Sequence, residues 1–366
     1  MKRITGYLRL LVPTALIVGL VPLGGAIASA AGAPAQGGSA TLNASGATFP
    51  QSYYEEVIGA FKQKDPDITV NYAGGGSGKG RQDFADQVTD FGASDAPYNA
   101  TDAAGVKGGT FFYFPTVAAP ITVSYNLKNV KKLQLSPDTI AKIFQGEIKT
   151  WDDAAIKADN TGVKLPSTAI TVAHRADGSG TTENFTKFLA AAAPNVWTLG
   201  SGSTVSWPSD TQAGQGNQGV GQVVKSTDGA IGYVDFSDAR ALKLKFARIK
   251  NADGKYVAPT VKATTAAVGK AQVKDDLTYD PLNASGASAY PISAPTWLLV
   301  YQNQSNAPKA SALKKFLNFI YGDGQKLAPE VDYAPLPKSL LDKAKAQVKQ
   351  LRGSSRSSGS STATTT

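Results

Sequence analysis

The sequence contains no cysteine, and this absence removes several kinds of site at once. Disulfide bonds, thiolate metal sites and a lipid anchor carried by cysteine are all excluded. Histidine occurs once, at His174, so a metal site built from several histidines is excluded as well. A Ser-His-Asp triad would depend on that single residue. We therefore expect no metal site, no cofactor and no catalytic residue.

The sequence also lacks a hydrophobic run long enough to cross a membrane. Pro13 and Pro22 bracket only eight residues, whereas a spanning helix needs about 20 apolar residues. Residues 1–30 instead have the basic start, apolar middle and small-residue end of a secretory signal peptide, with cleavage after Ala30. The alternative, an uncleaved anchor, is disfavoured by the short run. We expect a periplasmic or secreted protein, soluble after cleavage, with residues 31–40 as a flexible leader.

Charged residues are few, at 18 % of the chain, and the net charge is +9. A basic balance favours attraction of anions without saying which anion. It is a common feature of soluble proteins, and we do not expect nucleic-acid binding from it. The length of 366 residues and the apolar content of 42 % are sufficient for two domains with their own cores.

The mature chain alternates strand-like and helix-like segments, which predicts an α/β fold with largely parallel sheets. Residues 51–66 have a helical period, with Tyr54, Val57, Ile58 and Phe61 on one face. Ser136 precedes Pro137 and predicts a capped helix start. Further strands are expected at 67–73, 169–175, 229–236 and 295–302, and another is expected to end in 90–97. A new block begins at 110–127, and further helices are expected at 81–88, 181–193 and 311–322. From residue 346 onward we expect a disordered tail, because residues 352–366 are rich in Ser and Thr and of low complexity.

Two glycine-rich stretches superficially suggest nucleotide binding. "GGGSGKG" (74–80) fails the phosphate-loop pattern, because Gly80 follows Lys79 and Ala73 stands at the first glycine position. "GQGNQG" (214–219) matches the dinucleotide pattern but follows no strand, so we interpret it as a loop that opens a helix. The first stretch still lies between a strand and a helix, where backbone N–H groups and the Ser77 hydroxyl can face an anion. A plain tight turn is the alternative.

"RADGSGTT" (175–182) carries a stronger signal. The planar fork of Arg175 can hold two oxygens at once. Ser179, Gly180 and Thr181 can offer backbone N–H groups at a helix start, where anions are favoured. Asp177 stands close enough to pair with Arg175 and fix its orientation. A salt-bridged surface loop is the alternative, and His174 is expected to be a packed strand residue rather than a ligand.

Asp95 stands at the end of a predicted strand in "GASDAP" (92–97), where α/β proteins place their ligands. A cap or turn residue is the alternative role. If Asp95 and Arg175 face one cleft, the ligand must be an anion that also donates a hydrogen bond. Phosphate keeps a proton at neutral pH and sulfate does not, so this carboxylate would accept from phosphate and repel sulfate.

These pieces occur in an order that resembles a known family. "SGATFP" (45–50), "GGGSGKG", "DFGASDAP" and "RADGSGTT", together with "FPTV" (114–117), "WDD" (151–153), "GSTVSWP" (202–208), "GAIGYVD" (229–235) and "YAPLP" (333–337), are similar to the periplasmic phosphate-binding proteins of Pst-type ABC transporters. The likeness runs from about Thr41 to Pro337. No single piece is decisive, since "SGATFP" alone would be an ordinary turn, but the ordered set is specific.

The resemblance implies a two-lobed type II periplasmic-binding-protein fold, with the ligand in a cleft between lobes joined by a two-strand hinge near Val117 and Tyr290. Lobe one would comprise 41–117 and 291–345, and lobe two 118–290. Asp177 would orient the arginine. The implied phosphate ligands are Thr48, Phe49, Ser77, Asp95, Arg175, Ser179, Gly180 and Thr181.

The resemblance further implies a monomer that binds inorganic phosphate tightly outside the cytoplasmic membrane and delivers it to membrane permease subunits for import. The chain departs from lipoprotein relatives because it has no cysteine to carry a lipid. Two alternatives stay open: a secreted phosphatase-like enzyme, and an adhesion protein on the same scaffold. Generic phosphate-ester hydrolysis would favour the first, and absence of tight anion binding the second.

Overall fold

The computed structural model describes residues 39–354. The predicted signal peptide, most of the predicted leader and the end of the predicted tail lie outside this range. None of the helices in residues 39–354 is long and apolar enough to span a membrane. Residues 39–354 belong to one compact unit, which begins at Gly38.

The first half of the fold is built from alternating strands and helices. Helix α1 presents Tyr53, Tyr54, Val57 and Phe61 to the core, as its helical period predicts, while Ile58 is only partly buried. Strand β1 pairs in parallel with both β2 and β3. The elements are β1 (Ala40–Gly46), α1 (Gln51–Lys64), β2 (Ile68–Gly74), α2 (Ser77–Ala85), β3 (Phe91–Ser94) and α3 (Ala100–Ala104).

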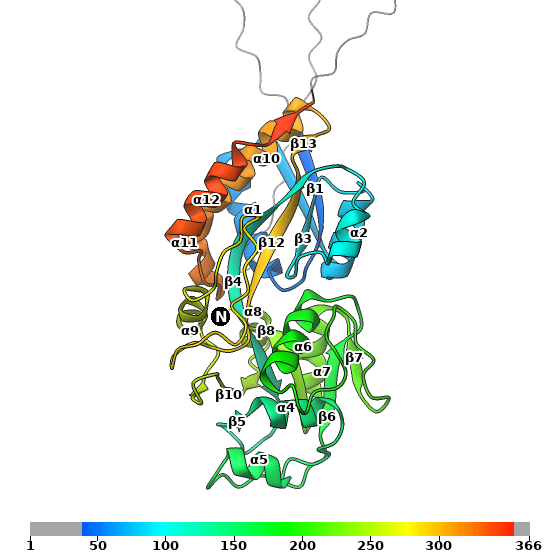
Figure 1. The fold of residues 1–366 in the computed structure, drawn as a ribbon, viewed down its shortest axis with the longest axis vertical. Coiled ribbons are helices and arrows are strands. Elements are labelled where there is room, and N and C mark those ends of the chain that lie inside the picture. Colours follow the sequence, from blue (N-terminus) through cyan, green and yellow to red (C-terminus); the bar gives the residue numbers. More distant parts are fainter. Residues whose placement is uncertain (1–38, 355–366) are drawn as a thin grey trace, which may run out of the picture. The chain divides into compact units, whose positions relative to one another are not determined.

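Two long strands connect this half to the rest of the unit. β4 (Phe111–Tyr125) pairs antiparallel with β12 (Ser293–Tyr301) through its first ten residues, Phe111 to Pro120, and with β8 from Ile121 onward. Figure 1 shows β4 running from the part that holds β1 and β3 into the part that holds β6 and β8. The sheet order is β2-β1-β3-β12-β4-β8-β6-β7, with β9 also paired to β4.

The second half repeats the alternation around β6, which is parallel to β7 and β8. Ser136 caps α4 as predicted, because its Oγ accepts a hydrogen bond from the Thr139 N–H. The elements are β5 (Gln134–Leu135), α4 (Pro137–Phe144), α5 (Ala154–Asp159), β6 (Thr171–Arg175), α6 (Gly180–Ala192), β7 (Gln212–Gly214), α7 (Gly216–Ser226), β8 (Ala230–Asp235), α8 (Phe236–Ala241), β9 (Lys245–Phe246), β10 (Arg248–Lys250), β11 (Tyr256–Val257) and α9 (Val261–Val268).

After β12 the chain returns to the first half, where α10 packs against β1 and α2 packs against β1 and β3. In Figure 1, α10 and α12 lie on one side of these strands and α2 on the other. The elements are β13 (Asn303–Gln304), α10 (Ala307–Phe319), a π-helical turn (Ile320–Gly324), α11 (Gln325–Leu327), a 3₁₀ turn (Ala328–Val331), α12 (Lys338–Val348) and β14 (Arg352–Gly353).

Two sequence-based expectations need correction. The tail does not begin at residue 346, because Gln347 and Val348 are buried in α12 and β14 pairs with β13. The sheet is mixed rather than largely parallel. Its two outer parts are parallel, but β12 is antiparallel to β3 and β4, and β4 to β8. The reason is that the chain crosses between the halves in both directions, so its two crossing strands run in opposite senses.

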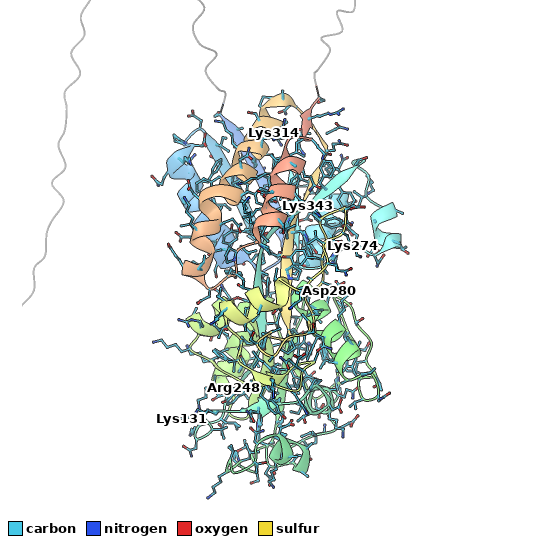
Figure 2. The ribbon with its side chains drawn as sticks, turned by 60° about the vertical axis from the view of Figure 1, so that its left-hand side comes forward. Lys131, Arg248, Lys274, Asp280, Lys314 and Lys343 are labelled. Carbon is cyan, nitrogen blue, oxygen red and sulfur yellow. The ribbon has the colours of Figure 1, made fainter. Side chains whose placement is uncertain are left out.

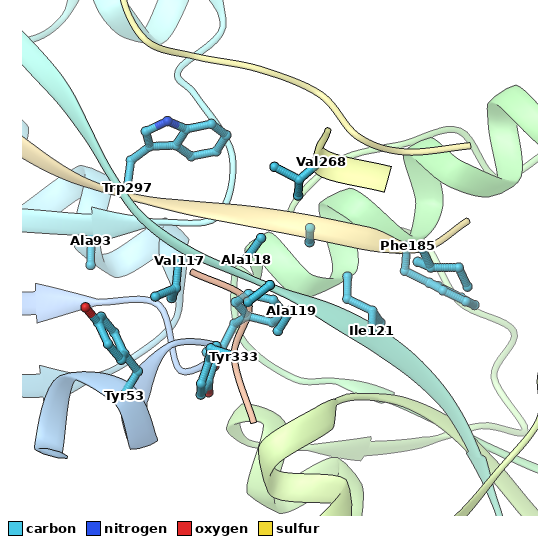
Figure 3. Close-up of a cluster of buried hydrophobic side chains, with 14 of the residues drawn as sticks. Tyr53, Ala93, Val117, Ala118, Ala119, Ile121, Phe185, Val268, Trp297 and Tyr333 are labelled. Atoms are coloured by element: carbon cyan, nitrogen blue, oxygen red, sulfur yellow. The ribbon is translucent and has the colours of Figure 1, made fainter. Parts of the chain in front are cut away.

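The hydrophobic core is continuous along the crossing strands. Val117, Ala118, Ala119 and Ile121 of β4 are all fully buried, and Figure 3 shows them in a row beside β12, with Tyr333 close by. Ala118 also forms an isolated antiparallel bridge with Ala334. Small side chains at 118 and 119 therefore allow three chain segments to pack tightly where the two halves meet.

Candidate functional site

The four motifs singled out in the sequence all follow the carboxyl ends of parallel strands. β1 is followed by Ala47 to Phe49, β2 by the glycine turn that opens α2, β3 by Asp95, and β6 by the segment that opens α6. The carboxyl ends of parallel strands in open α/β sheets are where ligands bind. The fold therefore brings the motifs of both halves to one place.

The start of α6 supplies a built anion-binding geometry. Ser179 is the N-cap, and its Oγ accepts a hydrogen bond of 3.0 Å from the Thr182 N–H. Ser179 and Thr181 are fully buried. The first N–H groups of a helix have no partner within the helix and carry a partial positive charge. The first turn of α6 can thus hold negative charge out of contact with water.

Arg175 lies at the end of β6 and is held in place by Asp177. The Arg175 Nε donates to Asp177 Oδ1 at 2.9 Å, and its Nη2 pairs with Asp177 Oδ2. The Gly216 N–H also donates to Asp177 Oδ1, at 2.9 Å. Burial would raise the pKa of Asp177, but its hydrogen bonds with Arg175 and the arginine charge outweigh burial and hold the pKa below its ordinary value. The ion pair leaves the Arg175 Nη1, 3.4 Å from Thr181 Oγ1, facing the α6 turn.

Asp95 is the second buried charge, and its environment differs. Asp95 is only 1 % exposed, and its Oδ2 accepts a hydrogen bond of 3.2 Å from Ser77 Oγ. Oδ1 is buried without a hydrogen-bond partner in residues 39–354. Burial raises the pKa of Asp95 to about 7, even though the nearby hydroxyl groups of Thr296 and Ser77 and the charges of Arg175 and Arg81 lower it. A carboxylate oxygen without a partner in such a place is an acceptor that a ligand hydroxyl can satisfy.

Contacts between glycines bring the two halves together at the site. The Gly78 N–H of α2 donates to the Gly178 carbonyl at 2.9 Å. A Cβ at Gly78 would lie 3.1 Å from the Gly178 Cα, and one at Gly180 would lie 2.7 Å from the Asp95 Cβ and 2.8 Å from its Oδ2. These glycines therefore allow close approach of the backbones of the two halves.

Thr48 and Asn217 connect the remaining parts. Asn217 of α7 is fully buried, and its Nδ2 donates to Thr48 Oγ1 and to Thr181 Oγ1, both at 3.1 Å. Phe49 contributes its ring to the core, edge-on to Tyr333, whose hydroxyl donates to the Phe49 carbonyl at 2.5 Å. Contacts thus run from Thr48 through Asn217 to Thr181 and Arg175, and from Ser77 through Asp95 to Gly180.

Comparison with known proteins agrees with this geometry. Residues 29–324 match the family model described as the PBP superfamily domain. The phosphate-binding protein PstS of Methanocaldococcus jannaschii is 36 % identical over 365 residues, covering 91 % of this chain and 92 % of its own length. Phosphate-binding protein PstS 3 of Mycobacterium leprae is 36 % identical over 313 residues, covering 83 % of this chain and 85 % of its own.

The chain belongs to the PstS family of phosphate-binding proteins. Among solved structures, the high-affinity periplasmic phosphate-binding protein PfluDING, bound with phosphate, superposes with a TM-score of 0.70. Its sequence is 24 % identical, and the match covers 84 % of this chain and 93 % of that one. The expected α/β periplasmic-binding-protein fold of type II is confirmed.

Several residues that shape this candidate site were missed in the sequence. Tyr233 is one, since its hydroxyl accepts from the Arg175 N–H at 3.0 Å and bonds to Thr182 Oγ1 at 2.7 Å. Asn184 is another, since its Nδ2 donates to the Asp95 carbonyl at 2.7 Å and to the Gly180 carbonyl at 2.9 Å. Asn217 lies inside the "GQGNQG" stretch, where a polar side chain among glycines was the available signal. His174 stacks on Trp207, with ring centroids 5.3 Å apart, which fits its expected role as a packed strand residue.

The glycine contact gives a first testable prediction. Gly78→Ala is expected to weaken phosphate binding by about tenfold or more, because the new methyl group meets Gly178 when the halves close. Gly78 lies within α2 and is not among the glycines with positive φ. The same change should therefore raise the thermal stability of the ligand-free protein, since Ala is favoured over Gly in helices. Calorimetric titration and thermal unfolding measure the two effects, with Gly59→Ala in α1, where a Cβ meets nothing, as the control. Unchanged affinity would contradict the role of the contact.

Proposed function

We propose that this protein binds one inorganic phosphate ion in the cleft between the two halves of the fold and delivers it to the permease subunits of an ABC transporter. The observation that carries the proposal is the buried Asp95, whose Cβ and Oδ2 lie beside Gly180 at the start of α6 and whose Oδ1 lacks a partner in residues 39–354. A proton on the ligand satisfies this acceptor, while the helix start and Arg175 hold the other oxygens. Membership of the PstS family supports the same ligand.

Eight residues form the proposed phosphate site. Asp95 accepts the phosphate proton, and Arg175 donates through its fork in an orientation set by Asp177. The backbone N–H groups of Thr48 and Phe49, together with those of Gly180 and Thr181, surround the remaining oxygens. The Ser179 N–H is not free as the sequence predicted, because it donates to the Ser203 carbonyl at 2.9 Å, so Ser179 would contribute its hydroxyl. The proposed ligands are Thr48, Phe49, Ser77, Asp95, Arg175, Ser179, Gly180 and Thr181, of which all but Thr48 are buried.

The proposal includes two lobes and a hinge. Lobe one comprises 41–117 and 291–345, and lobe two 118–290, so the chain crosses between them near Val117 and Tyr290. The pairing of β4 with β12 on one side and with β8 on the other supports this division. Both lobes come from one chain and complete one site, which supports a monomer. Phosphate binding then shifts the population from an open to a closed form, and the closed form is the one that the permease recognises.

The proposed location is outside the cytoplasmic membrane. The signal-peptide pattern of residues 1–30 supports export, and the absence of cysteine from the sequence supports a protein without a cysteine-linked lipid. We propose the periplasm, where a soluble binding protein meets the permease.

We propose that the protein does not hydrolyse phosphate esters, although one contact resembles an enzyme site. Ser77 Oγ donates to Asp95 Oδ2 at 3.2 Å, which places a hydroxyl beside a carboxylate. Both residues are almost fully buried, which disfavours access of an ester to the hydroxyl. The wild-type protein incubated with p-nitrophenyl phosphate is expected to release no more p-nitrophenol than the Ser77→Ala variant does. Turnover abolished by that substitution would establish the enzymatic alternative instead.

A thermal-unfolding measurement tests the proposed ligand. Phosphate at about 100 times its dissociation constant should stabilise the phosphate-stripped protein by about 2.7 kcal/mol, because only the folded state binds it. Sulfate at the same concentration should leave the melting temperature unchanged, because it carries no proton for Asp95. Equal shifts with both anions would contradict selective phosphate binding.

A further inference from the structure

A second ion pair connects the two halves outside the proposed phosphate site. Arg81 lies in α2 and Glu183 in α6, and the Arg81 Nη1 is 3.2 Å from Glu183 Oε2. Both side chains are only 12 % exposed. The pair joins residues 102 positions apart in the sequence. It is thus a largely desolvated contact made by closure of the fold rather than a local surface pair.

The pair is located at the rim of the cleft. Glu183 stands one helical turn after Ser179, since its N–H donates to the Ser179 carbonyl at 3.0 Å. Two surface hollows of about 440 and 570 Å³ meet around Arg81, and both are also lined by Tyr98, Asp102 and Ser203. Glu183 lines the larger one. Water therefore reaches the pair from its sides, while the phosphate ligands one turn away are buried.

Each charge keeps partners within its own half. The Arg81 Nη1 also donates to Ser94 Oγ at 3.2 Å and to the Ala96 carbonyl at 3.3 Å. Glu183 Oε1 pairs with Lys187 Nζ at 2.7 Å, one turn further along α6. These bonds persist when the halves separate, so only the Arg81–Glu183 bond depends on closure. An interaction made in one conformation alone shifts the equilibrium toward that conformation.

We propose that Arg81 and Glu183 form a latch that holds the cleft closed and sets how long phosphate stays bound. The inference rests on the proposed phosphate function for its ligand but concerns residues that do not contact the phosphate. Removing a buried, hydrogen-bonded charge pair acts mainly on dissociation, whereas exposed rim charges act mainly on association. The latch therefore slows release without changing capture, and both residues act as positioning residues.

The test uses the absence of native cysteine. Cysteine replaces one exposed valine in each half, and the two cysteines are labelled with a donor and an acceptor dye. The valines are Val88 in the first half, which is 70 % exposed, and Val163 in the second half, which is 37 % exposed. Energy transfer between the dyes reports closure. Mixing phosphate with this V88C/V163C protein gives the association rate, and mixing the loaded protein with excess unlabelled protein as a phosphate sink gives the dissociation rate.

Glu183→Gln is expected to raise the dissociation rate by about tenfold, within the usual range for conformational coupling, and to leave the association rate within about twofold. Arg81→Gln should also raise the dissociation rate, although it additionally removes a charge that lowers the pKa of Asp95. The double variant should be no faster than the faster single variant. Lys187→Gln is the matched control, because it removes the other partner of Glu183 and leaves the pair between the halves intact. It should release phosphate at the wild-type rate.

Ligand-free protein separates this proposal from the proposed function. In ligand-free protein, Glu183→Gln should lower the closed fraction. If it does so while phosphate has no effect on the closed fraction of the wild type, the latch is supported and phosphate is overturned as the ligand. Phosphate-driven closure with identical release rates and identical closed fractions in wild type and Glu183→Gln would overturn the latch alone. A fall in association rate with unchanged dissociation would also overturn it, since the pair would then steer phosphate rather than hold it.

Discussion

Arg175→Ala is expected to weaken phosphate binding by roughly two to four orders of magnitude, the effect of leaving a buried charge without its partner. The physical reason is the balance of charge in the site. Arg175 is paired with Asp177, and Asp95 is buried nearby, so two carboxylates accompany one guanidinium. Without the guanidinium, a phosphate dianion would meet two negative groups and only helix-start and backbone dipoles. Calorimetric titration of the phosphate-stripped variant measures the loss.

Two further variants separate loss of charge from loss of folding. Adding Asp177→Asn to Arg175→Ala should recover part of the affinity, because the carboxylate left without its arginine is neutralised. Arg248→Ala is the matched control, since Arg248 is exposed on β10 and Figure 2 shows it in the second half with Lys131. It should bind like the wild type. Near-native phosphate affinity in Arg175→Ala would place this residue outside the site.

Asp95→Asn is expected to narrow the preference for phosphate over sulfate from about 10³-fold or more to about tenfold. The wild-type carboxylate accepts the phosphate proton and repels sulfate, which has none. The amide of Asn carries no charge and can donate to sulfate. Asp102→Asn is the matched control, because Asp102 is an exposed carboxylate of the same half. Unchanged selectivity in Asp95→Asn would contradict the role of Asp95.

The raised pKa of Asp95, about 7, gives this selectivity a pH dependence. Above pH 7 the carboxylate is ionised and repels sulfate. Below pH 7 it is protonated, and its O–H can donate to a sulfate oxygen. Sulfate binding by the wild type should therefore strengthen as the pH falls from about 8.5 to about 5.5, whereas sulfate binding by Asp95→Asn should stay constant over the same range. A pH-independent wild type would show that Asp95 does not face the anion.

Much of the fold was predictable because its signals are local. The apolar face of α1 follows from the spacing of Tyr54, Val57 and Phe61, and the α4 cap follows from Ser136 before Pro137. The Arg175–Asp177 pair was also predictable, because the two residues are two positions apart at the end of a strand. Such features depend on neighbouring residues and survive in any tertiary context that keeps the element.

Other features depend on which segments the fold brings together. The approach of Gly78 to Gly178 and the Arg81–Glu183 pair each join segments about 100 residues apart, and no local pattern indicates them. The mixed sheet and the later start of the tail follow from pairings of β4 with β12 and of β13 with β14, which are also long-range. The eight proposed ligands were identified by resemblance of ordered motifs, and the structure shows how parts of both halves approach one another around Asp95 and α6.

Calorimetric titration of the phosphate-stripped mature protein with phosphate, and separately with sulfate, is the most direct test of phosphate selectivity. At about pH 8.5, where the Asp95 carboxylate is ionised, we expect tight one-to-one binding of phosphate and no heat with sulfate. We expect the same stoichiometry for Asp95→Asn, with sulfate now binding. Absence of heat with phosphate, or equal affinity of the wild type for both anions, would contradict the claim that a buried carboxylate makes this cleft selective for phosphate.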